Sequence, residues 1–269
     1  RRSMFWSFRV AAAEPGKIDP MHQFEVTPYG GFNLGGYEIM FTNSALWMLV
    51  AAALLGLFMW GGMRRELVPG RWQVAVEGFT GFISSMMTST IGPEGRKFTP
   101  YVFSLFMFIL FLNILGLLPL GVLGIHPFTV TSHIAITGVL AVLSFAIVLV
   151  VGFWRHGFHF FSLFVPHGTP MVMIPMIALI EFVSFMIRPF SLAIRLFVAM
   201  TAGHVLTKVL AGFLINSTNA GAVYGVLVGI PSFLLMIGIG ALELLVAGIQ
   251  AYVFALLTSV YINDAVNLH

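Results

Sequence analysis

Six ionisable side chains lie inside two long apolar stretches of this chain, and they are the first indication of its chemistry. They are Glu181, Arg188, Arg195, His204, Lys208 and Glu243. On insertion scales, an ionisable group near the centre of a bilayer costs about 2.5–3.5 kcal/mol. Side chains this costly are expected to handle an ion in the membrane. Arg188 and Lys208 have an alternative, because a long side chain near a helix end can extend to the headgroups.

Spacing places five polar residues on one face of a helix that would contain Arg195. Counted from the first, they fall at positions 0, 3, 7, 10 and 14, and they are Glu181, Ser184, Arg188, Ser191 and Arg195. This spacing stacks side chains along a single helical face. His204 follows nine residues after Arg195. At about 100° per residue, it lies on the opposite face of the same helix. The helix is therefore expected to present two separate polar surfaces.

The residue types suggest different tasks for these two surfaces. Arginine stays protonated in proteins, so Arg195 would be a fixed positive charge and not a proton carrier. His204 and Glu243 can both change protonation near physiological pH when burial and a neighbour assist. Gln250 follows seven residues after Glu243 and shares its face of the last helix. The sequence thus predicts a fixed cation at Arg195 and a titratable pair formed by His204 and Glu243.

The elements that must position these residues are membrane helices. The chain is 59% hydrophobic and 9% charged, with a mean hydropathy of +0.98. Soluble domains average about 25% charged residues, so this surface is not built for water. The 269 residues leave room for about five to six spans. The chain has no cysteine, which excludes disulfides and thiolate metal sites, and we predict no cofactor.

Three apolar runs predict ordinary spans, over Phe41–Gly62, Phe98–Pro119 and Ile134–Phe153. Arg71–Ile91 mixes aromatic and polar residues, which is typical of an amphipathic helix that lies at the interface or under other protein. Residues 1–38 are more polar and are expected to lie outside the membrane. Residues 39–269 are expected to form one membrane domain.

Two further apolar runs, residues 170–213 and 224–261, are too long for simple spans. A helix of about forty residues measures roughly 60 Å, twice the thickness of a hydrocarbon core. Each run is therefore two pieces or one strongly tilted helix, and the polar link Asn216–Asn219 makes them a hairpin. The predicted fold is an all-α integral membrane protein of about five to six helices. Its last two helices form a long tilted hairpin, and one amphipathic helix lies at the interface.

Basic residues predict the orientation. Those in the connections would all lie on one side, and they are Arg64, Arg65, Arg71, Arg96, Lys97 and Arg155. The connections 121–133 and 216–221 contain none. The basic side and the C-terminus should therefore face the cytoplasm or matrix. The same rule explains the net charge of +3 and the pI near 9.5 without a nucleic-acid partner.

Several motifs resemble one known family. The chain reads Ser191-Leu-Ala-Ile-Arg195-Leu-Phe197, followed by Ala202-Gly203-His204. Four more stretches, in order, are Asn113-Ile-Leu-Gly-Leu-Leu-Pro119, Phe160-Phe-Ser-Leu-Phe-Val-Pro166, Gln250-Ala-Tyr-Val-Phe254 and Tyr261-Ile-Asn-Asp264. Together they resemble subunit a of the rotary F-type ATP synthase, from about residue 19 to the C-terminus. The order His204 then Glu243 is similar to mitochondrial and alphaproteobacterial members. It implies the inner membrane of a mitochondrion or the plasma membrane of a bacterium.

The resemblance implies a role for each matching residue. Arg195 corresponds to the arginine that faces the carboxylates of the c-ring and separates two offset half-channels. His204 and Glu243 match a polar pair that lines one half-channel. Other positions on the proton pathway are matched by Glu181, Ser191, Gln250 and Asn113. Ala199 departs from the family, which usually has asparagine there, and this puts in doubt how the nearby half-channel is hydrated.

The resemblance also implies partners and a division of labour. The c-ring, the peripheral stalk, other ATP synthase subunits and membrane lipids would surround the chain. The chain itself would form no ATP bond and would not be catalytic. It would use proton flow to bias the rotation of the c-ring.

Two other functions fit some of the same residues. An ion-coupled secondary transporter would bind an anionic substrate at Arg195 and couple protons through His204 and Glu243. Such transporters have inverted repeats and short broken helices, whereas this chain has no evident repeat and its last helices are long. An intramembrane hydrolase would need a nucleophile beside a base. Ser191 lies thirteen residues from His204 and outside any Gly-x-Ser-Gly turn.

Overall fold

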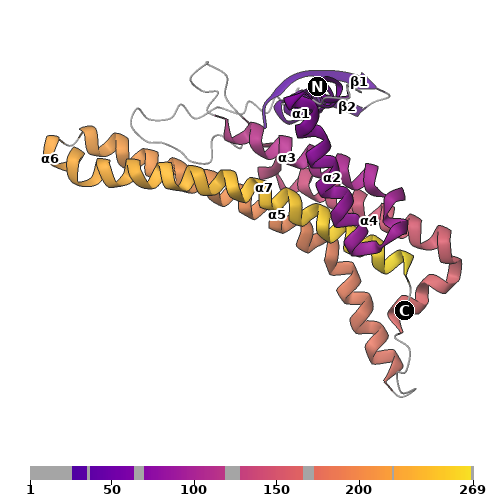
Figure 1. The fold of residues 1–269 in the computed structure, drawn as a ribbon. Helices are drawn as coiled ribbons and strands as arrows, with labels where there is room; N and C mark the ends of the chain where they lie inside the picture. The colour runs from indigo at the N-terminus through magenta and orange to yellow at the C-terminus, as the bar shows by residue number, and fades with distance from the viewer. Residues whose placement is uncertain are drawn as a thin grey trace. The chain divides into compact units, whose positions relative to one another are not determined.

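The computed structural model describes residues 26–34, 37–63, 70–118, 128–165, 173–219 and 221–267 (Figure 1). The long helices are α1 (Asn43–Gly62), α2 (Arg71–Ile91), α3 (Thr99–Leu117), α4 (Ile134–His156), α5 (Ile174–Asn219) and α7 (Ile230–Val266). Five segments are long and apolar enough to cross a membrane: 43–62, 99–117, 134–164, 174–217 and 225–266. The predicted all-α membrane fold is confirmed.

Short elements connect these helices. They are β1 (Pro28–Leu34), β2 (Tyr37–Thr42), η2 (Pro93–Lys97), η4 (Val130–Ser132), η5 (Gly157–Phe164), α6 (Ala222–Tyr224) and the π-helical η6 (Gly225–Gly229). β1 and β2 pair antiparallel, with Leu34 opposite Tyr37. The sequence predicts no strands in this region. Residues 1–25, which are expected to lie outside the membrane, are not among the described residues.

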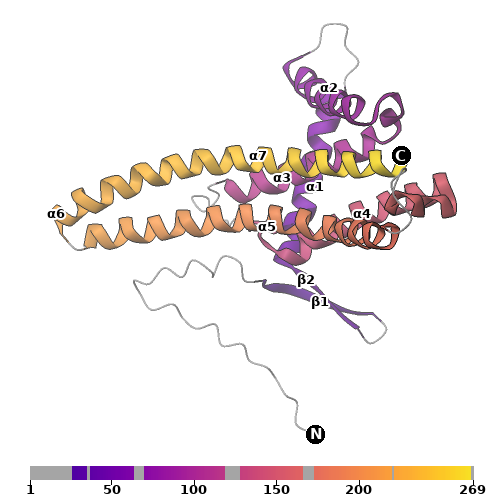
Figure 2. The same cartoon turned by 90° about the horizontal axis from the view of Figure 1, so that it is seen from below.

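α1 begins directly after β2, and its start is capped. The Thr42 hydroxyl accepts a 3.5 Å hydrogen bond from the Ala45 N–H, which satisfies one of the unpaired donors of the first turn. The β1–β2 hairpin and α2 lie at opposite ends of α1 (Figure 2). α1 is therefore the element that separates the two ends of this part of the protein.

The amphipathic helix expected over Arg71–Ile91 is α2. Its buried side chains fall on one face and are Gln73, Val76, Ile83, Met86, Met87 and Ile91. Trp72 ties this helix to α1, because its indole N–H donates a 2.9 Å hydrogen bond to the carbonyl oxygen of Phe58. α2 does not belong to the five apolar segments. It is covered on one face by protein and open on the other.

Contacts divide the chain into two compact units. One contains residues 203–241, and the other contains residues 26–202 and 242–269. In the larger unit, α3 is the most enclosed span, with 56% of its apolar window buried against 11% for α1. The core of this unit also contains Phe185 and Leu196 of α5, and Phe254 and Ile262 of α7.

Small residues allow α7 to pack closely in the larger unit. Ala247, Ala251, Ala255 and Ser259 are spaced four residues apart, and each is fully buried. Residues at this spacing form one ridge of a helix. Small side chains on such a ridge let helix backbones approach closely inside a membrane. Glu243, only 5% exposed, stands one turn before this ridge.

In the smaller unit, the hairpin turn differs from the prediction. The sequence predicts a polar link at Asn216–Asn219, but α5 remains helical to Asn219. The chain reverses at Gly221, whose φ of +113° is accessible mainly to glycine. Ser217 bonds within the helix, because its hydroxyl donates a 2.7 Å hydrogen bond to the carbonyl oxygen of Leu214. The chain therefore changes direction at Gly221 and not at the polar residues before it.

Candidate functional site

Arg195 projects from an exposed, apolar face of α5. Ile187, Ile194 and Val198 surround it on this face and are 54%, 48% and 49% exposed. Within the described residues, Arg195 makes no hydrogen bond and no ion pair. A guanidinium in an apolar setting is costly unless an anion compensates it. Within the described residues, no acidic side chain compensates the charge of Arg195.

The rest of the predicted polar stripe also lies away from the core. Ser184 and Ser191 are exposed, and Glu181 is half-buried. The opposite side of α5 is packed into the core, with Leu192 and Leu196 almost fully buried. The side chains at 181, 184, 191 and 195 thus share the open side of the helix, as their spacing predicts.

Arg188 belongs to the same stripe but has a partner on α7. Its Nη1 lies 2.7 Å from Oδ2 of Asp264. The guanidinium carbon lies 5.4 Å from the ring centre of Phe185 and 5.0 Å from that of Tyr261. The sequence left open an extension of Arg188 to the headgroups, and the structure shows that its guanidinium is paired with Asp264. Asp264 was noted only as part of a motif, because sequence spacing cannot pair residues 76 positions apart.

A polar contact on α3 lies close to Glu243. Asn113 is fully buried, and its Nδ2 donates a 3.1 Å hydrogen bond to the carbonyl oxygen of Ala247. Ala247 comes one helical turn after Glu243 and three residues before the half-buried Gln250. The Oδ1 of Asn113 is buried and has no hydrogen-bond partner within the described residues. Asn113, Glu243 and Gln250, which are predicted site residues, therefore lie along the contact between α3 and α7.

The buried turn η4 is a polar feature that sequence reasoning missed. Thr131 and Ser132 are buried, and neither hydroxyl oxygen has a partner in the described part of the chain. The backbone oxygen of Ser132 accepts a 3.5 Å hydrogen bond from the hydroxyl of Thr201 on α5. Thr201 lies between Arg195 and His204 in sequence. The available signal was a run of polar residues at 131–133 between two apolar spans.

His204 lies in the smaller unit and is half-buried. Lys208 follows it by one helical turn. No group of three His, Cys, Asp or Glu side chains that could hold a metal ion occurs in the described ranges. A histidine can transfer a proton near neutral pH, and a lysine can stabilise a negative charge.

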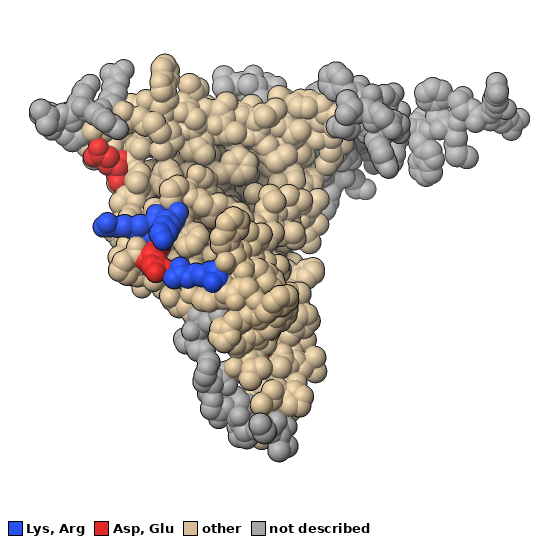
Figure 3. Space-filling model, turned by 90° about the vertical axis from the view of Figure 1, so that its right-hand side faces the viewer, with Lys and Arg blue, Asp and Glu red and all other residues tan. Residues whose placement is uncertain are grey.

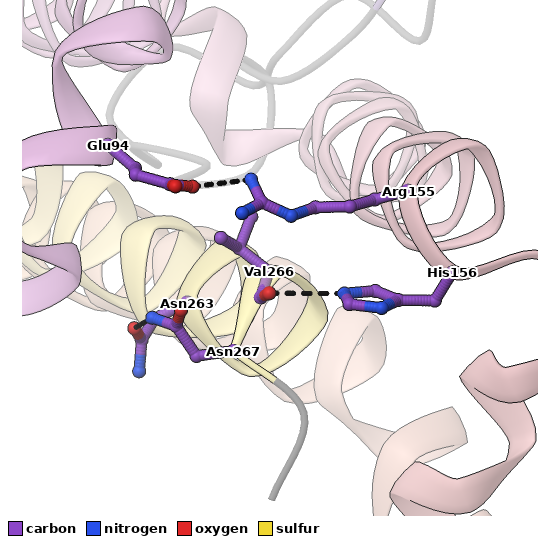
Figure 4. A network of polar contacts seen from close by, with 6 residues as sticks. All are labelled: Glu94, Arg155, His156, Asn263, Val266 and Asn267. Atoms are coloured by element: carbon purple, nitrogen blue, oxygen red, sulfur yellow. Dashed lines mark hydrogen bonds and ion pairs between the residues drawn. The ribbon is translucent and has the colours of Figure 1, made fainter.

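A second polar cluster joins three chain segments at one end of the larger unit (Figure 4). Arg155 at the end of α4 forms a 2.5 Å ion pair with Glu94 of η2. The hydrogen bond to Arg155 holds the pKa of Glu94 below its ordinary value. His156 lies 3.1 Å from the carbonyl oxygen of Val266, the last residue of α7. The end of α7 thus lies beside two of the basic connections.

One face of the molecule is poor in charge. Figure 3 shows acidic and basic side chains along one side of this face, while the rest of the described surface in the same view carries none. Trp154 and Phe158, next to Arg155 in sequence, are 89% and 92% exposed. Exposed aromatic residues beside charged ones are typical of the boundary between hydrocarbon and headgroups.

Comparisons with known proteins agree on one family. The family described as ATP synthase A chain matches residues 45–263. "ATP synthase subunit a" of Sphingopyxis alaskensis is 82% identical over 260 residues, which cover 96% of this chain and 100% of the relative. The protein of the same name from Rhizorhabdus wittichii is 72% identical with the same coverage. That of Rhodospirillum rubrum is 44% identical and covers 93% of this chain and 99% of its own length.

Proposed function

This chain belongs to the ATP synthase A chain family, and we infer that it is the stationary membrane subunit that carries protons to and from a rotating c-ring. The observation that supports this most directly is Arg195. It is a permanent cation on an exposed apolar face of α5, without a partner in the described residues. A ring of carboxylates that passes this face supplies the missing anion.

Arg195 has two effects in this proposal. Its charge favours the deprotonated form of the ring carboxylate that faces it, so a carboxyl group arriving there gives up its proton. The same charge repels a proton that would cross directly between the two sides. Each 100 mV of membrane potential is worth about 2.3 kcal/mol per proton. A direct path would dissipate that free energy, so the barrier is as necessary as the pathway.

Glu243, Gln250 and Asn113 are proposed to line one half-channel, and His204 is proposed as a position of the proton pathway because it matches the family motif. Support comes from the buried oxygens of Asn113, Thr131 and Ser132, which have no partner in the described residues. Buried polar atoms are usually satisfied by protein or by ordered water. Water bound by these atoms would give protons a path along α3 and η4 toward α5 and α7.

Glu181 and Ser191 are proposed to line the second half-channel, on the open side of α5. Ala199, which is half-buried, offers no hydrogen bond beside this route. Bound water must replace any amide contact at that position. We therefore expect the path near Ala199 to depend on water more than on side chains.

The remaining proposals concern the surroundings of the chain. The c-ring and the peripheral stalk would be its partners within the ATP synthase, and the chain would have no catalytic site of its own. The relatives named above are bacterial, which favours a bacterial plasma membrane over a mitochondrial one. Basic connections beside the end of α7 favour a cytoplasmic C-terminus, with residues 1–38 outside. A secondary transporter is not favoured, because α5 and α7 are long and continuous.

The decisive test is Arg195→Ala in the complete ATP synthase, reconstituted into vesicles with an imposed proton gradient. ATP synthesis driven by the gradient should disappear, while ATP hydrolysis by the assembled complex remains. Hydrolysis and subunit content establish that the variant has assembled. Coupled synthesis that persists in an assembled Arg195→Ala complex would overturn the proposal.

A further inference from the structure

We propose that Asp264 neutralises Arg188, so that Arg195 is the one uncompensated cation that the described polar stripe of α5 offers to a passing carboxylate. This inference rests on the function proposed above. It assigns Asp264 and Arg188 as positioning residues, because neither is required to touch the transferred proton. Their task is to remove a competing charge from the face of Arg195.

The contacts around Arg188 hold it in this paired state. The ion pair with Asp264 measures 2.7 Å, and the two side chains are 25% and 26% exposed. Phe185 contributes a ring from α5, and Tyr261 contributes one from α7, one helical turn before Asp264. A cation held over aromatic rings and bonded to a carboxylate has few free orientations. Arg188 is therefore directed toward α7 and away from the open side of α5.

The distance to Arg195 explains why this matters. Arg188 precedes Arg195 by seven residues, which is two turns or roughly 10 Å along the helix. A free guanidinium at this spacing would attract the same ring carboxylate at a second position. The carboxylate would then have two favourable positions along α5, and its release toward the half-channel would be slower. Because Arg188 is paired with Asp264, only the position opposite Arg195 remains.

A purely mechanical role for the ion pair makes different predictions. If the pair only joined α5 to α7, Asp264→Asn would reduce the amount of assembled synthase, but each assembled complex would pump as many protons per ATP as the unaltered one. If Asp264 instead cancels the charge of Arg188, the assembled Asp264→Asn complex itself pumps poorly. Removing both charges should then be less harmful than removing Asp264 alone. Pumping per ATP hydrolysed, measured on assembled complexes, separates these two roles.

The experiment measures ATP-driven proton pumping per ATP hydrolysed, using the complete synthase in vesicles. Asp264→Asn leaves Arg188 charged and should lower this ratio roughly tenfold. Adding Arg188→Gln should restore it to within about twofold of the unaltered protein. Asp264→Glu keeps the charge and should also preserve pumping. The matched control is the double variant Glu94→Gln, Arg155→Gln, which removes an exposed ion pair between η2 and α4 and should pump normally.

Two results would overturn the inference. One is a double variant no better than Asp264→Asn, and the other is an Asp264→Asn protein that pumps normally. Asp264→Glu also tests whether the pair is needed for folding. If this variant loses both pumping and assembly, the pair has a structural role and the inference is wrong. Arg195→Ala is measured in the same vesicles. If that variant keeps pumping, the proposed function fails, whatever the Asp264 variants show.

Discussion

The side-chain amide of Asn113 donates a hydrogen bond to the backbone oxygen of Ala247, across 134 positions of sequence. A helical carbonyl oxygen has two lone pairs, so it can accept this bond in addition to its own helical one. The bond fixes α3 against α7 between Glu243 and Gln250. Asn113 is thus both a structural contact and a buried polar atom beside the proposed proton path.

Asn113→Leu should therefore impair the complex in two ways. Losing a buried hydrogen bond costs about 1–3 kcal/mol, which should lower the thermal midpoint of the purified complex. Loss of the free Oδ1 should also slow proton flux into vesicles. Asn267→Ala is the control, because Asn267 is an exposed donor to Asn263 at the end of α7. A normal flux in Asn113→Leu would remove Asn113 from the path.

Glu243→Gln should slow proton flux without preventing assembly. The substitution keeps the size of a side chain that is 5% exposed but removes its ability to carry a proton. We expect flux below that of the unaltered protein throughout the neutral and mildly alkaline range. Glu77→Gln on α2 changes an exposed carboxylate and should have no effect. Unchanged flux across this range would show that Glu243 is not part of the half-channel.

Arg195→Lys tests whether permanence of the charge matters. An ammonium group in an apolar setting can lose its proton, whereas a guanidinium does not. A lysine would then be an intermittent barrier, and most gradient-driven ATP synthesis should be lost. Arg96→Lys on the exposed η2 serves as the control and should synthesise ATP normally. Full synthesis in Arg195→Lys would mean that any cation is sufficient.

Two glycines of α4 test the packing of this span. A Cβ on Gly152 would collide with the buried ring of Phe160, while a Cβ on Gly138 meets no described atom within 4 Å. Overpacking of a core costs about 1–3 kcal/mol. Gly152→Ala should therefore lower the thermal midpoint of the complex, and Gly138→Ala should leave it unchanged or slightly raised. Equal midpoints for the two variants would contradict the close contact between Gly152 of α4 and Phe160 of η5.

The Glu94–Arg155 ion pair predicts a local effect of pH. Arg155 holds the pKa of Glu94 below its ordinary value of 4.5, so the pair contributes its stability above that value. The contribution is lost as the pH falls through the depressed pKa. The protection of backbone amides in η2, which is their exchange rate relative to the intrinsic rate at the same pH, should thus be lower in acid than at neutral pH. Glu94→Gln should show the lower protection at both pH values, and identical protection in the two proteins at neutral pH would disprove the effect.

Hydrophobic runs predicted the helices of this fold well, because each span must satisfy its backbone internally. The amphipathic α2 and the excessive length of α5 and α7 were also evident from sequence. The small hairpin β1–β2 was not, since residues 28–42 lack a clear alternation of apolar and polar side chains. The helical continuation through Asn216–Asn219 was missed because polar residues were interpreted as a loop.

The site was predictable in part. Spacing alone placed Ser184, Ser191 and Arg195 on one face of α5, and the structure agrees. The sequence alone could not predict contacts between elements far apart in the chain, because such contacts depend on how the helices pack. The pairing of Arg188 with Asp264 is the clearest example, and the buried turn at Thr131 and Ser132 is another. The sequence identifies the ionisable residues of the long helices, but only the fold shows that Arg188 has a partner in Asp264.

The contact between His156 and the carbonyl oxygen of Val266 has a consequence for biogenesis. The two residues are separated by 110 positions. At ordinary translation rates, the ribosome needs roughly 5 to 20 s to make that length of chain. During this interval α4 has emerged, but its partner at the end of α7 has not been synthesised. The newly inserted bundle must therefore stay open in the lipid until translation is nearly finished.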